Sequence, residues 1–183
     1  MNARLEPPVQ VCRLKRTPKH RAIYFLRKRS MACWLMKSEP HEFSFDDLIK
    51  AKNQTVAWFG VRNYQARNMM RDLMTVGDDV LFYHSSCAEP GIAGFATVAS
   101  PPYPDPTQFD KKSKYFDEKA TPQTPRWMLV DVKYAKPSRL ISLTELRTHT
   151  ALEDMVILKR GNRLSITPVT AGEWRAIQKL AAK

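Results

Sequence analysis

Apolar and polar residues follow two different periods from position 31 onward. The unbroken run CWLMK at 33–37 predicts a buried strand that stops before Pro40, because proline lacks the N–H that a central strand needs. A second, shorter strand is expected at 55–58. Over residues 62–73, apolar side chains recur every three or four positions, which predicts an amphipathic helix.

The second half of the chain carries further strand signals. Residues 79–85 and 92–99 are expected to form two strands separated by a Pro-Gly turn. Apolar residues alternate over 126–134, and another strand is expected at 163–167. Residues 100–125 contain six prolines and should be mostly loop. That loop is either a lid over a binding site or, as is commoner, a plain surface excursion.

Helix starts are marked by capping residues. Ser44 precedes two aspartates and an apolar pair, while Ser142–Glu145 and Thr170–Glu173 have the spacing of capping boxes. The expected strands are interrupted by short helices, without a regular βαβ rhythm. We therefore expect an α+β fold, built as a small mixed β-barrel with short flanking helices.

Composition limits the chain to one folded domain. With 183 residues, of which 43% are hydrophobic, there is room for a single proper core. No stretch approaches the length needed to span a membrane. Cys12, Cys33 and Cys87 are odd in number and widely spaced. We therefore expect reduced thiols, no structural zinc site and a cytoplasmic location.

The net charge of +12 is distributed unevenly. Residues 1–30 hold nine basic side chains and one acidic one, a net charge of +8, whereas residues 31–183 hold 21 basic and 17 acidic ones, a net charge of +4. The part expected to fold is therefore only mildly basic. Charge alone does not define a nucleic-acid-binding face on it.

The basic leader at 1–30 has little apolar periodicity and three prolines, so it cannot fold alone. It is a disordered arm that contacts phosphates, a targeting peptide, or an artefact of start-site choice, with Met31 as the real initiator. We favour the artefact, because the compact pattern begins directly after Met31. The expected domain then covers residues 31–183.

Familiar enzyme signatures are missing from the sequence. It contains no Walker loop, no GxGxxG and no GxSxG motif. The four histidines, His20, His41, His84 and His149, are scattered, and none belongs to a recognisable triad motif. The sequence therefore predicts a protein that uses no cofactor or metal and catalyses no reaction.

Four clusters of polar and aromatic residues remain to be explained. They are WLMKSEP at 34–40, WFGVRNY at 58–64, FYHS at 82–85 and RLS at 163–165. In the first, the alternation of a strand places Lys37 and Glu39 on one face. In the second, a tryptophan precedes a helix start, where free backbone N–H groups suit an anion or a base carbonyl.

Several longer strings contain these clusters in order: WLMKSEP at 34–40, GVRNYQARN at 60–68, FYHS at 82–85, GIAGFATV at 91–98 and RLSITPV at 163–169. With these strings the chain resembles the EVE domain family, from about residue 33 to its end. The resemblance implies a PUA-like fold and a pocket for a flipped, modified base. The base would be 5-methylcytosine or 5-hydroxymethylcytosine in DNA or, as a less favoured partner, a modified base in RNA.

Roles for the residues of such a pocket follow from the resemblance. An extruded base loses stacking energy, which an aromatic side chain and hydrogen bonds to the base edge must offset. We assign the stacking role to Trp58. Ser38, Asn63 and Ser85 would donate or accept hydrogen bonds at the base edge.

The remaining candidate residues complete the pocket and its rim. Tyr83 and His84 would line its wall. Arg62 and Arg163 would hold flanking phosphates. Ser165, on the same strand face as Arg163, is the last candidate ligand-binding residue.

Each assignment competes with a structural role. Trp58 could be a core tryptophan and Asn63 a helix cap. Ser38 could only shape a turn, and His84 could be a hydrogen-bonded structural histidine. Arg163 could pair with a surface carboxylate. The family resemblance favours the binding roles.

A second function comes from another class of protein. The PUA-like superfamily also resembles the ASCH group, some of whose members are small amidohydrolases that use a lysine and a glutamate. A buried pair of Lys37 and Glu39 could supply a lysine of lowered pKa for such chemistry on modified nucleosides. This alternative leaves the Trp58 and Arg163 clusters unexplained.

Overall fold

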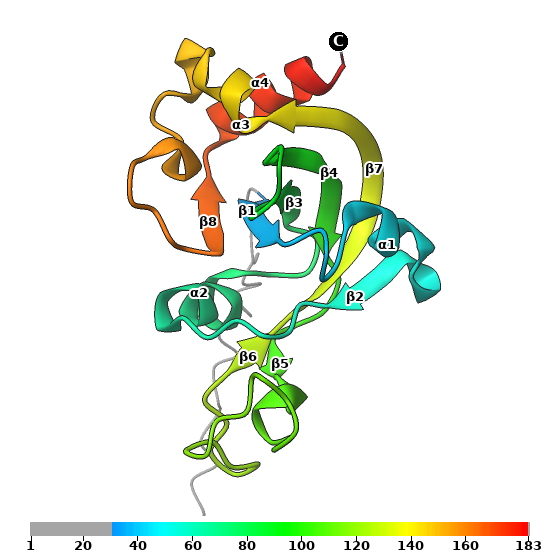
Figure 1. The fold of residues 1–183 in the computed structure, drawn as a ribbon, viewed down its shortest axis with the longest axis vertical. Helices are drawn as coiled ribbons and strands as arrows, with labels where there is room; N and C mark the ends of the chain where they lie inside the picture. Colours follow the sequence, from blue (N-terminus) through cyan, green and yellow to red (C-terminus); the bar gives the residue numbers. More distant parts are fainter. Residues whose placement is uncertain (1–30, 183) are drawn as a thin grey trace, which may run out of the picture.

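The computed structural model describes residues 31–182, so the basic leader lies outside the described residues. Its main feature is a curled six-stranded sheet with the strand order β2-β7-β4-β3-β1-β8 (Figure 1). Strands β1 and β3 run parallel, and all other neighbours in this sheet run antiparallel. The six strands are β1 Cys33–Ser38, β2 Thr55–Ala57, β3 Asp79–His84, β4 Gly91–Val98, β7 Asp131–Ser142 and β8 Ile166–Val169.

Short helices lie on both sides of the sheet. The α-helices are α1 Phe45–Lys50, α2 Tyr64–Asn68, α3 Leu143–Arg147 and α4 Ala171–Ala181. A π-helical turn, Met69–Leu73, continues α2, and single 3-10 turns occupy Lys52–Gln54, Pro106–Gln108, Thr150–Leu152 and Val156–Leu158. The predicted caps are confirmed, since Ser44, Ser142 and Thr170 each accept a hydrogen bond from the third backbone N–H of their helix.

Alternating side chains of the sheet enter two separate cores. In β1, Trp34 and Met36 face one cluster with helices α1 and α2, whereas Leu35 faces the other with helices α3 and α4. Because both faces are covered, the central strands are almost continuously apolar, as the run at 33–37 predicted. The α+β class and the mixed sheet that were predicted from the sequence are both confirmed.

Two predicted elements begin later than expected. The helix predicted at 62–73 starts at Tyr64, because Asn63 caps it, and its second half is π-helical. The strand predicted at 163–167 is the segment Ile166–Val169, which pairs with β1. Arg163 therefore precedes the strand.

The proline-rich segment has a defined structure of its own. Strands β5 Tyr103–Pro104 and β6 Met128–Leu129 pair as a small antiparallel ladder, and the chain between them forms the lobe below the main sheet in Figure 1. Gln108 is fully buried inside this lobe. Its amide nitrogen donates to the carbonyls of Asp105 and Trp127, and its amide oxygen accepts from the N–H groups of Arg126 and Trp127.

Trp34 is buried in the core and has a hydrogen-bond partner there. The indole N–H of Trp34 donates to the buried Asp78 carboxylate at 3.0 Å, which accounts for this tryptophan as a core residue.

Cys33 and Cys87 are free thiols, and burial raises the pKa of Cys33 to about 11. Among the described residues, no helix combines the length and apolar character required to cross a membrane.

Candidate functional site

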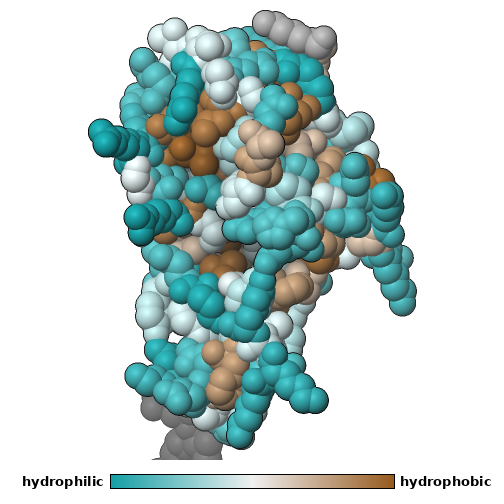
Figure 2. Space-filling view, in the orientation of Figure 1, coloured by the Kyte–Doolittle hydropathy of each residue, from teal (hydrophilic) through white to brown (hydrophobic). Residues whose placement is uncertain are grey.

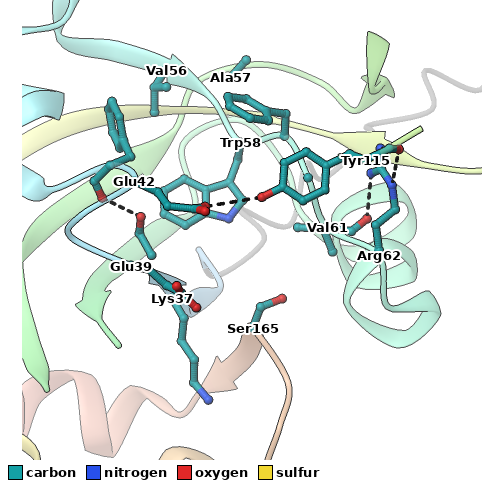
Figure 3. A pocket seen from close by; sticks show the side chains of 14 residues that line it. Lys37, Glu39, Glu42, Val56, Ala57, Trp58, Val61, Arg62, Tyr115 and Ser165 are labelled. Carbon is teal, nitrogen blue, oxygen red and sulfur yellow. Dashed lines mark hydrogen bonds between the residues drawn. The ribbon is translucent and has the colours of Figure 1, made fainter. Parts of the chain in front are cut away.

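A cavity of about 310 Å³ opens between the end of β1, the turn after β2 and the proline-rich lobe (Figure 3). This volume is at the lower end of the roughly 300–1,000 Å³ that is usual for small-ligand sites. The face seen in Figure 2 is mostly hydrophilic, with separate apolar patches between polar side chains. The cavity is lined by Lys37, Ser38, Glu39, Glu42, Phe43, Val56, Ala57, Trp58, Phe59, Gly60, Val61, Arg62, Tyr115 and Ser165.

Trp58 forms an aromatic wall of the cavity. Its backbone N–H donates to the carbonyl of Val130 at 2.9 Å, which fixes the chain where β2 ends. Its indole packs edge-on against Phe82, with ring centroids 5.3 Å apart, and only 7% of the residue is exposed. Trp58 is therefore both a core residue and a surface on which a flat ligand could stack.

Polar atoms converge on the same cavity from β1 and from the segment before β8. The Ser38 hydroxyl donates to the carbonyl of Phe43 at 2.6 Å, so its oxygen is left to accept a hydrogen bond. The Lys37 N–H donates to the carbonyl of Ser165 at 2.8 Å. This bond joins two lining segments that are far apart in the sequence.

Lys37 and Glu39 both line the cavity, but their side chains are not paired with each other. Burial lowers the pKa of Lys37, and its side chain extends away from Trp58 (Figure 3). The Glu39 carboxylate accepts a hydrogen bond from the Ser86 hydroxyl at 3.0 Å and lies 3.4 Å from His41. In the described part of the chain, no ion pair joins Lys37 to Glu39, so the amidohydrolase alternative has no support in this geometry.

Glu42 and Tyr115 close one side of the cavity. The Tyr115 hydroxyl donates to Glu42 at 3.4 Å, and the Lys114 ammonium forms an ion pair with the same carboxylate. The hydrogen bond from Lys114 is the main reason that the pKa of Glu42 is lowered. Since Tyr115 belongs to the proline-rich lobe, that lobe is part of the site rather than a plain excursion.

Glu39, His41 and Glu42 also form the one group of potential metal ligands found among the described residues. Their ligand atoms lie within 4.8 Å of one another. The group lies on the surface, and Glu42 is already paired with Lys114. We therefore assign no metal to it.

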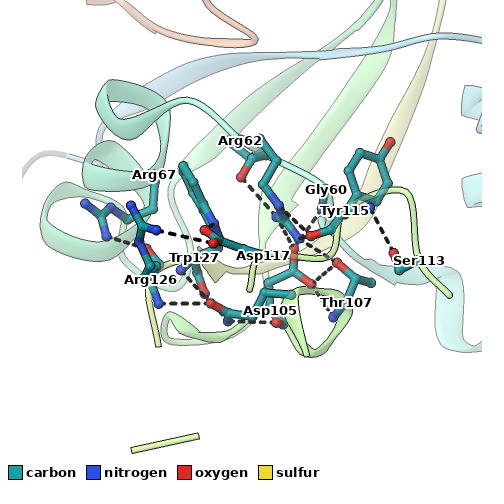
Figure 4. A network of polar contacts seen from close by, with 12 residues as sticks. Gly60, Arg62, Arg67, Asp105, Thr107, Ser113, Tyr115, Asp117, Arg126 and Trp127 are labelled. Carbon is teal, nitrogen blue, oxygen red and sulfur yellow. Dashed lines mark hydrogen bonds and ion pairs between the residues drawn. The ribbon is translucent and has the colours of Figure 1, made fainter. Parts of the chain in front are cut away.

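Arg62 connects the cavity to the lobe (Figure 4). All five of its N–H groups have protein acceptors. Nε donates to the Tyr115 carbonyl at 2.9 Å, and one Nη2 bond goes to the Thr107 hydroxyl at 3.0 Å. Nη1 donates to the Asp105 carboxylate at 2.8 Å and to the carbonyl of Val61, and the second Nη2 bond goes to the Tyr115 carbonyl. No N–H is left for a phosphate in this conformation.

Asp105 is the acceptor at the centre of this network. Its side chain is 2% exposed and accepts from Arg62, from the Gly60 N–H at 2.9 Å and from Thr107. Burial works to raise the pKa of Asp105, but hydrogen bonds from Thr107, Arg62 and Gly60 outweigh it and hold the pKa below its usual value. The network fixes the turn after Trp58 relative to Tyr115.

The other predicted residues lie outside the cavity lining. Asn63 accepts from the Ala66 N–H as the cap of α2. Tyr83 is buried in the core beneath α3 and α4, and burial raises its pKa to about 12. His84 accepts from the Phe45 N–H at 3.0 Å, while the Ser85 hydroxyl donates to the Ser38 carbonyl at 3.3 Å.

Of the nine candidate residues, the structure brings four together around the cavity: Ser38, Trp58, Arg62 and Ser165. Arg163 is exposed and does not line it. Sequence reasoning did not select Glu42 or Tyr115. The one signal for Tyr115 was its place in an irregular, proline-rich segment, which has no period from which a side chain's direction could be inferred.

Comparison with known proteins places the chain in a family. A model of the EVE domain matches residues 32–180. The chain belongs to the EVE domain family. Thymocyte nuclear protein 1 of Danio rerio is 42% identical over 171 residues, which are 84% of this chain and 73% of that protein.

Solved structures agree with this EVE domain assignment. A hypothetical protein from Leishmania major superimposes with a TM-score of 0.79 at 47% identity, covering 85% of this chain and 98% of that one. The human THYN1 protein, solved in complex with 5-methylcytosine-containing DNA, superimposes with a TM-score of 0.78 at 40% identity, covering 83% and 98%. The predicted PUA-like fold is confirmed.

The predicted cytoplasmic location is wrong, because the relatives of this EVE domain protein are named as nuclear proteins. The prediction rested on unpaired cysteines. Such cysteines indicate a reducing compartment, and disulfides are rare in the nucleus as well as in the cytosol. Cysteine usage therefore does not distinguish the two locations.

Proposed function

We propose that this EVE domain is a non-catalytic reader of a modified base in DNA, 5-methylcytosine or a close derivative, held in the cavity beside Trp58. The observation that carries the proposal is the cavity itself, which combines an indole wall with convergent polar atoms. The complex of human THYN1 with 5-methylcytosine-containing DNA supports the same ligand class.

The lining suits a methylated cytosine chemically. Stacking on an aromatic ring contributes about 1–3 kcal/mol per base, which is comparable to the cost of extruding the base from a duplex. Carboxylates accept from the exocyclic amine of cytosine, and Glu39 and Glu42 lie on the cavity wall. Val56, Ala57 and Val61 provide apolar surface for a methyl group.

The assignment of roles differs from the one based on the sequence alone. Trp58 keeps the stacking role, and the oxygen of Ser38 keeps a role at the base edge. Arg62 instead positions the turn and Tyr115, because its donors are occupied. Asn63, Tyr83, His84 and Ser85 act behind the cavity, and Arg163 is left as a residue that could contact a phosphate outside it.

The test is a binding titration of the full chain at fixed, near-physiological salt, because salt changes every phosphate contact. The probes are oligonucleotides of one sequence that carry cytosine, 5-methylcytosine or 5-hydroxymethylcytosine, as DNA and as RNA. We expect tighter binding to one modified DNA, lost in Trp58→Ala and reduced in Trp58→Phe. Trp174→Ala, on the opposite core of the sheet, is the matched control and should keep the preference.

Two results would contradict the proposal. One is equal affinity for all bases that disappears as salt is raised, which indicates non-specific phosphate contacts. The other is an unchanged preference in a folded Trp58→Ala protein. Far-ultraviolet circular dichroism and the urea midpoint establish that each variant is folded before its affinity is compared.

A further inference from the structure

The turn after β2 presents two aromatic side chains that differ strongly in exposure. Trp58 is 7% exposed, whereas Phe59, the next residue, is 53% exposed. Both nevertheless line the cavity. The turn thus places one ring inside the site and one at its mouth.

Hydrogen bonds hold the backbone at and on both sides of Phe59, and a neighbouring ring packs against its side chain. Its N–H donates to the Ala57 carbonyl at 3.0 Å. The N–H of the preceding residue donates to the Val130 carbonyl, and the N–H of the following residue donates to the Asp105 carboxylate. The Tyr115 ring packs edge-on against the Phe59 ring, with centroids 6.1 Å apart. An exposed side chain held in this way has already lost much of the conformational freedom that a binding event would otherwise cost.

Location, more than exposure, distinguishes Phe59. Single apolar side chains on a surface are common and need no explanation. Among the large hydrophobic side chains that are exposed in residues 31–182, however, Phe59 is the one that also lines the cavity. The others are Met31, Tyr64, Leu73, Val76 and Phe116.

A base that enters the cavity from a duplex leaves a gap in the base stack directly outside the mouth. Apolar wedges that enter such a step stabilise the opened duplex. We propose that Phe59 is this wedge, inserting beside the neighbouring base pair while the extruded base stacks on Trp58. The inference rests on the proposed function and extends it, because it makes duplex DNA, rather than a single strand or a free nucleoside, the preferred partner.

The experiment compares two forms of one strand that carries a single 5-methylcytosine, annealed to its complement or single-stranded. Both are titrated with the full chain, with Phe59→Ala and with Phe116→Ala. Phe116 is 38% exposed in the lobe and does not line the cavity, so it is the matched control. Phe59→Leu keeps an apolar contact for Tyr115 should the alanine variant fold poorly.

We expect Phe59→Ala to lose about tenfold in affinity for the duplex, the scale of one lost base stack, with less than about twofold change for the single strand. Phe116→Ala should change neither. An equal loss of affinity for both forms would mean that Phe59 is only a wall of the cavity, and it would overturn the wedge proposal. Unchanged affinity of Phe59→Ala for the duplex would also overturn it. If the wild-type chain does not prefer 5-methylcytosine to cytosine in the titration of the proposed function, that function fails first, which separates the two failures.

Discussion

The Tyr115 ring lies so close to the Cα of Gly60 that a Cβ atom at position 60 would be 2.6 Å from Cζ of the ring. Gly60 also has a φ of +82°, a conformation that other residues adopt only at a cost. Glycine is therefore required twice at this position, once by the backbone and once by the neighbouring ring. The close approach brings the lobe over the cavity.

Gly60→Ala should destabilise the protein and displace Tyr115. The left-handed backbone costs an alanine about 1–2 kcal/mol, and the steric clash with the ring adds roughly 1–3 kcal/mol. Gly77→Ala is the matched control, because Gly77 has a φ of +93° with no atom within 4 Å of a Cβ. Urea denaturation of both variants measures the difference, and equal losses would mean that the ring moves aside freely.

Removing one member of the Arg62–Asp105 ion pair should destabilise the protein more than removing both charges. Arg62→Ala leaves a buried carboxylate without its cation, which we expect to lower the free energy of unfolding by about 3 kcal/mol. The double variant Arg62→Ala, Asp105→Asn leaves neither charge, keeps an amide oxygen that accepts from Gly60 or Thr107, and should be more stable than Arg62→Ala. Denaturant melts of the single and double variants form a cycle, and simple additivity would contradict the coupling.

His84 should make stability depend on pH below neutrality. Burial lowers its pKa below the ordinary value of 6.5, and its Nε2 accepts from the Phe45 N–H, which a protonated imidazole cannot do. As the pH falls below 6.5, the unfolded chain binds a proton that the folded protein resists. The contribution of His84 to the free energy of unfolding is therefore fully present above pH 6.5, and it is lost progressively as the pH falls from 6.5 to the folded-state pKa.

The measurement is the urea midpoint between about pH 7.5 and 5, for the wild type and for His84→Gln, which keeps an acceptor that does not titrate in this range. We expect the slope with pH to be smaller in the variant. His41 and His149 remain in both proteins, so the difference between the two curves isolates His84. Identical slopes would remove His84 as the cause.

Gln108 should stabilise the folded structure of the proline-rich lobe against local opening. Its amide makes four hydrogen bonds to backbone groups. Gln108→Leu would leave the Arg126 and Trp127 N–H groups without an acceptor, whereas the Asp105 and Trp127 carbonyls keep backbone donors. Each such group costs about 1–3 kcal/mol, so the lobe should open before the sheet does. Hydrogen–deuterium exchange should increase over residues 103–129 and stay slow in β1 and β3, whereas Gln123→Leu, on the exposed surface, should change neither.

Local signals in the sequence were enough to predict the elements that depend on neighbours in the chain. The caps Ser44, Ser142 and Thr170 are found where the spacing placed them, because a cap and its helix are three residues apart. The buried strand at 33–37 was recognisable for a similar reason. Its apolar run is long enough to show that both faces are covered.

The candidate site depends on contacts that no local pattern contains. Arg62 bonds to Asp105 and Tyr115 across more than forty residues, so the motif around Arg62 gave no sign that its donors were occupied. The alternation that placed Lys37 and Glu39 on one face did not reveal that no ion pair joins these two side chains and that Glu39 instead lies next to His41. Arg163 was misplaced because the strand begins three residues later, at Ile166.

The bond from the Lys37 N–H to the Ser165 carbonyl has a consequence for how the protein is made. Strand β1 lies between β3 and β8, so one of the first strands to leave the ribosome is completed by one of the last. Contacts between such distant segments form late. A nascent or truncated chain that ends before residue 165 therefore lacks both Ser165 at the cavity and the strand that pairs with β1, and we expect it to bind a ligand less tightly than the full chain.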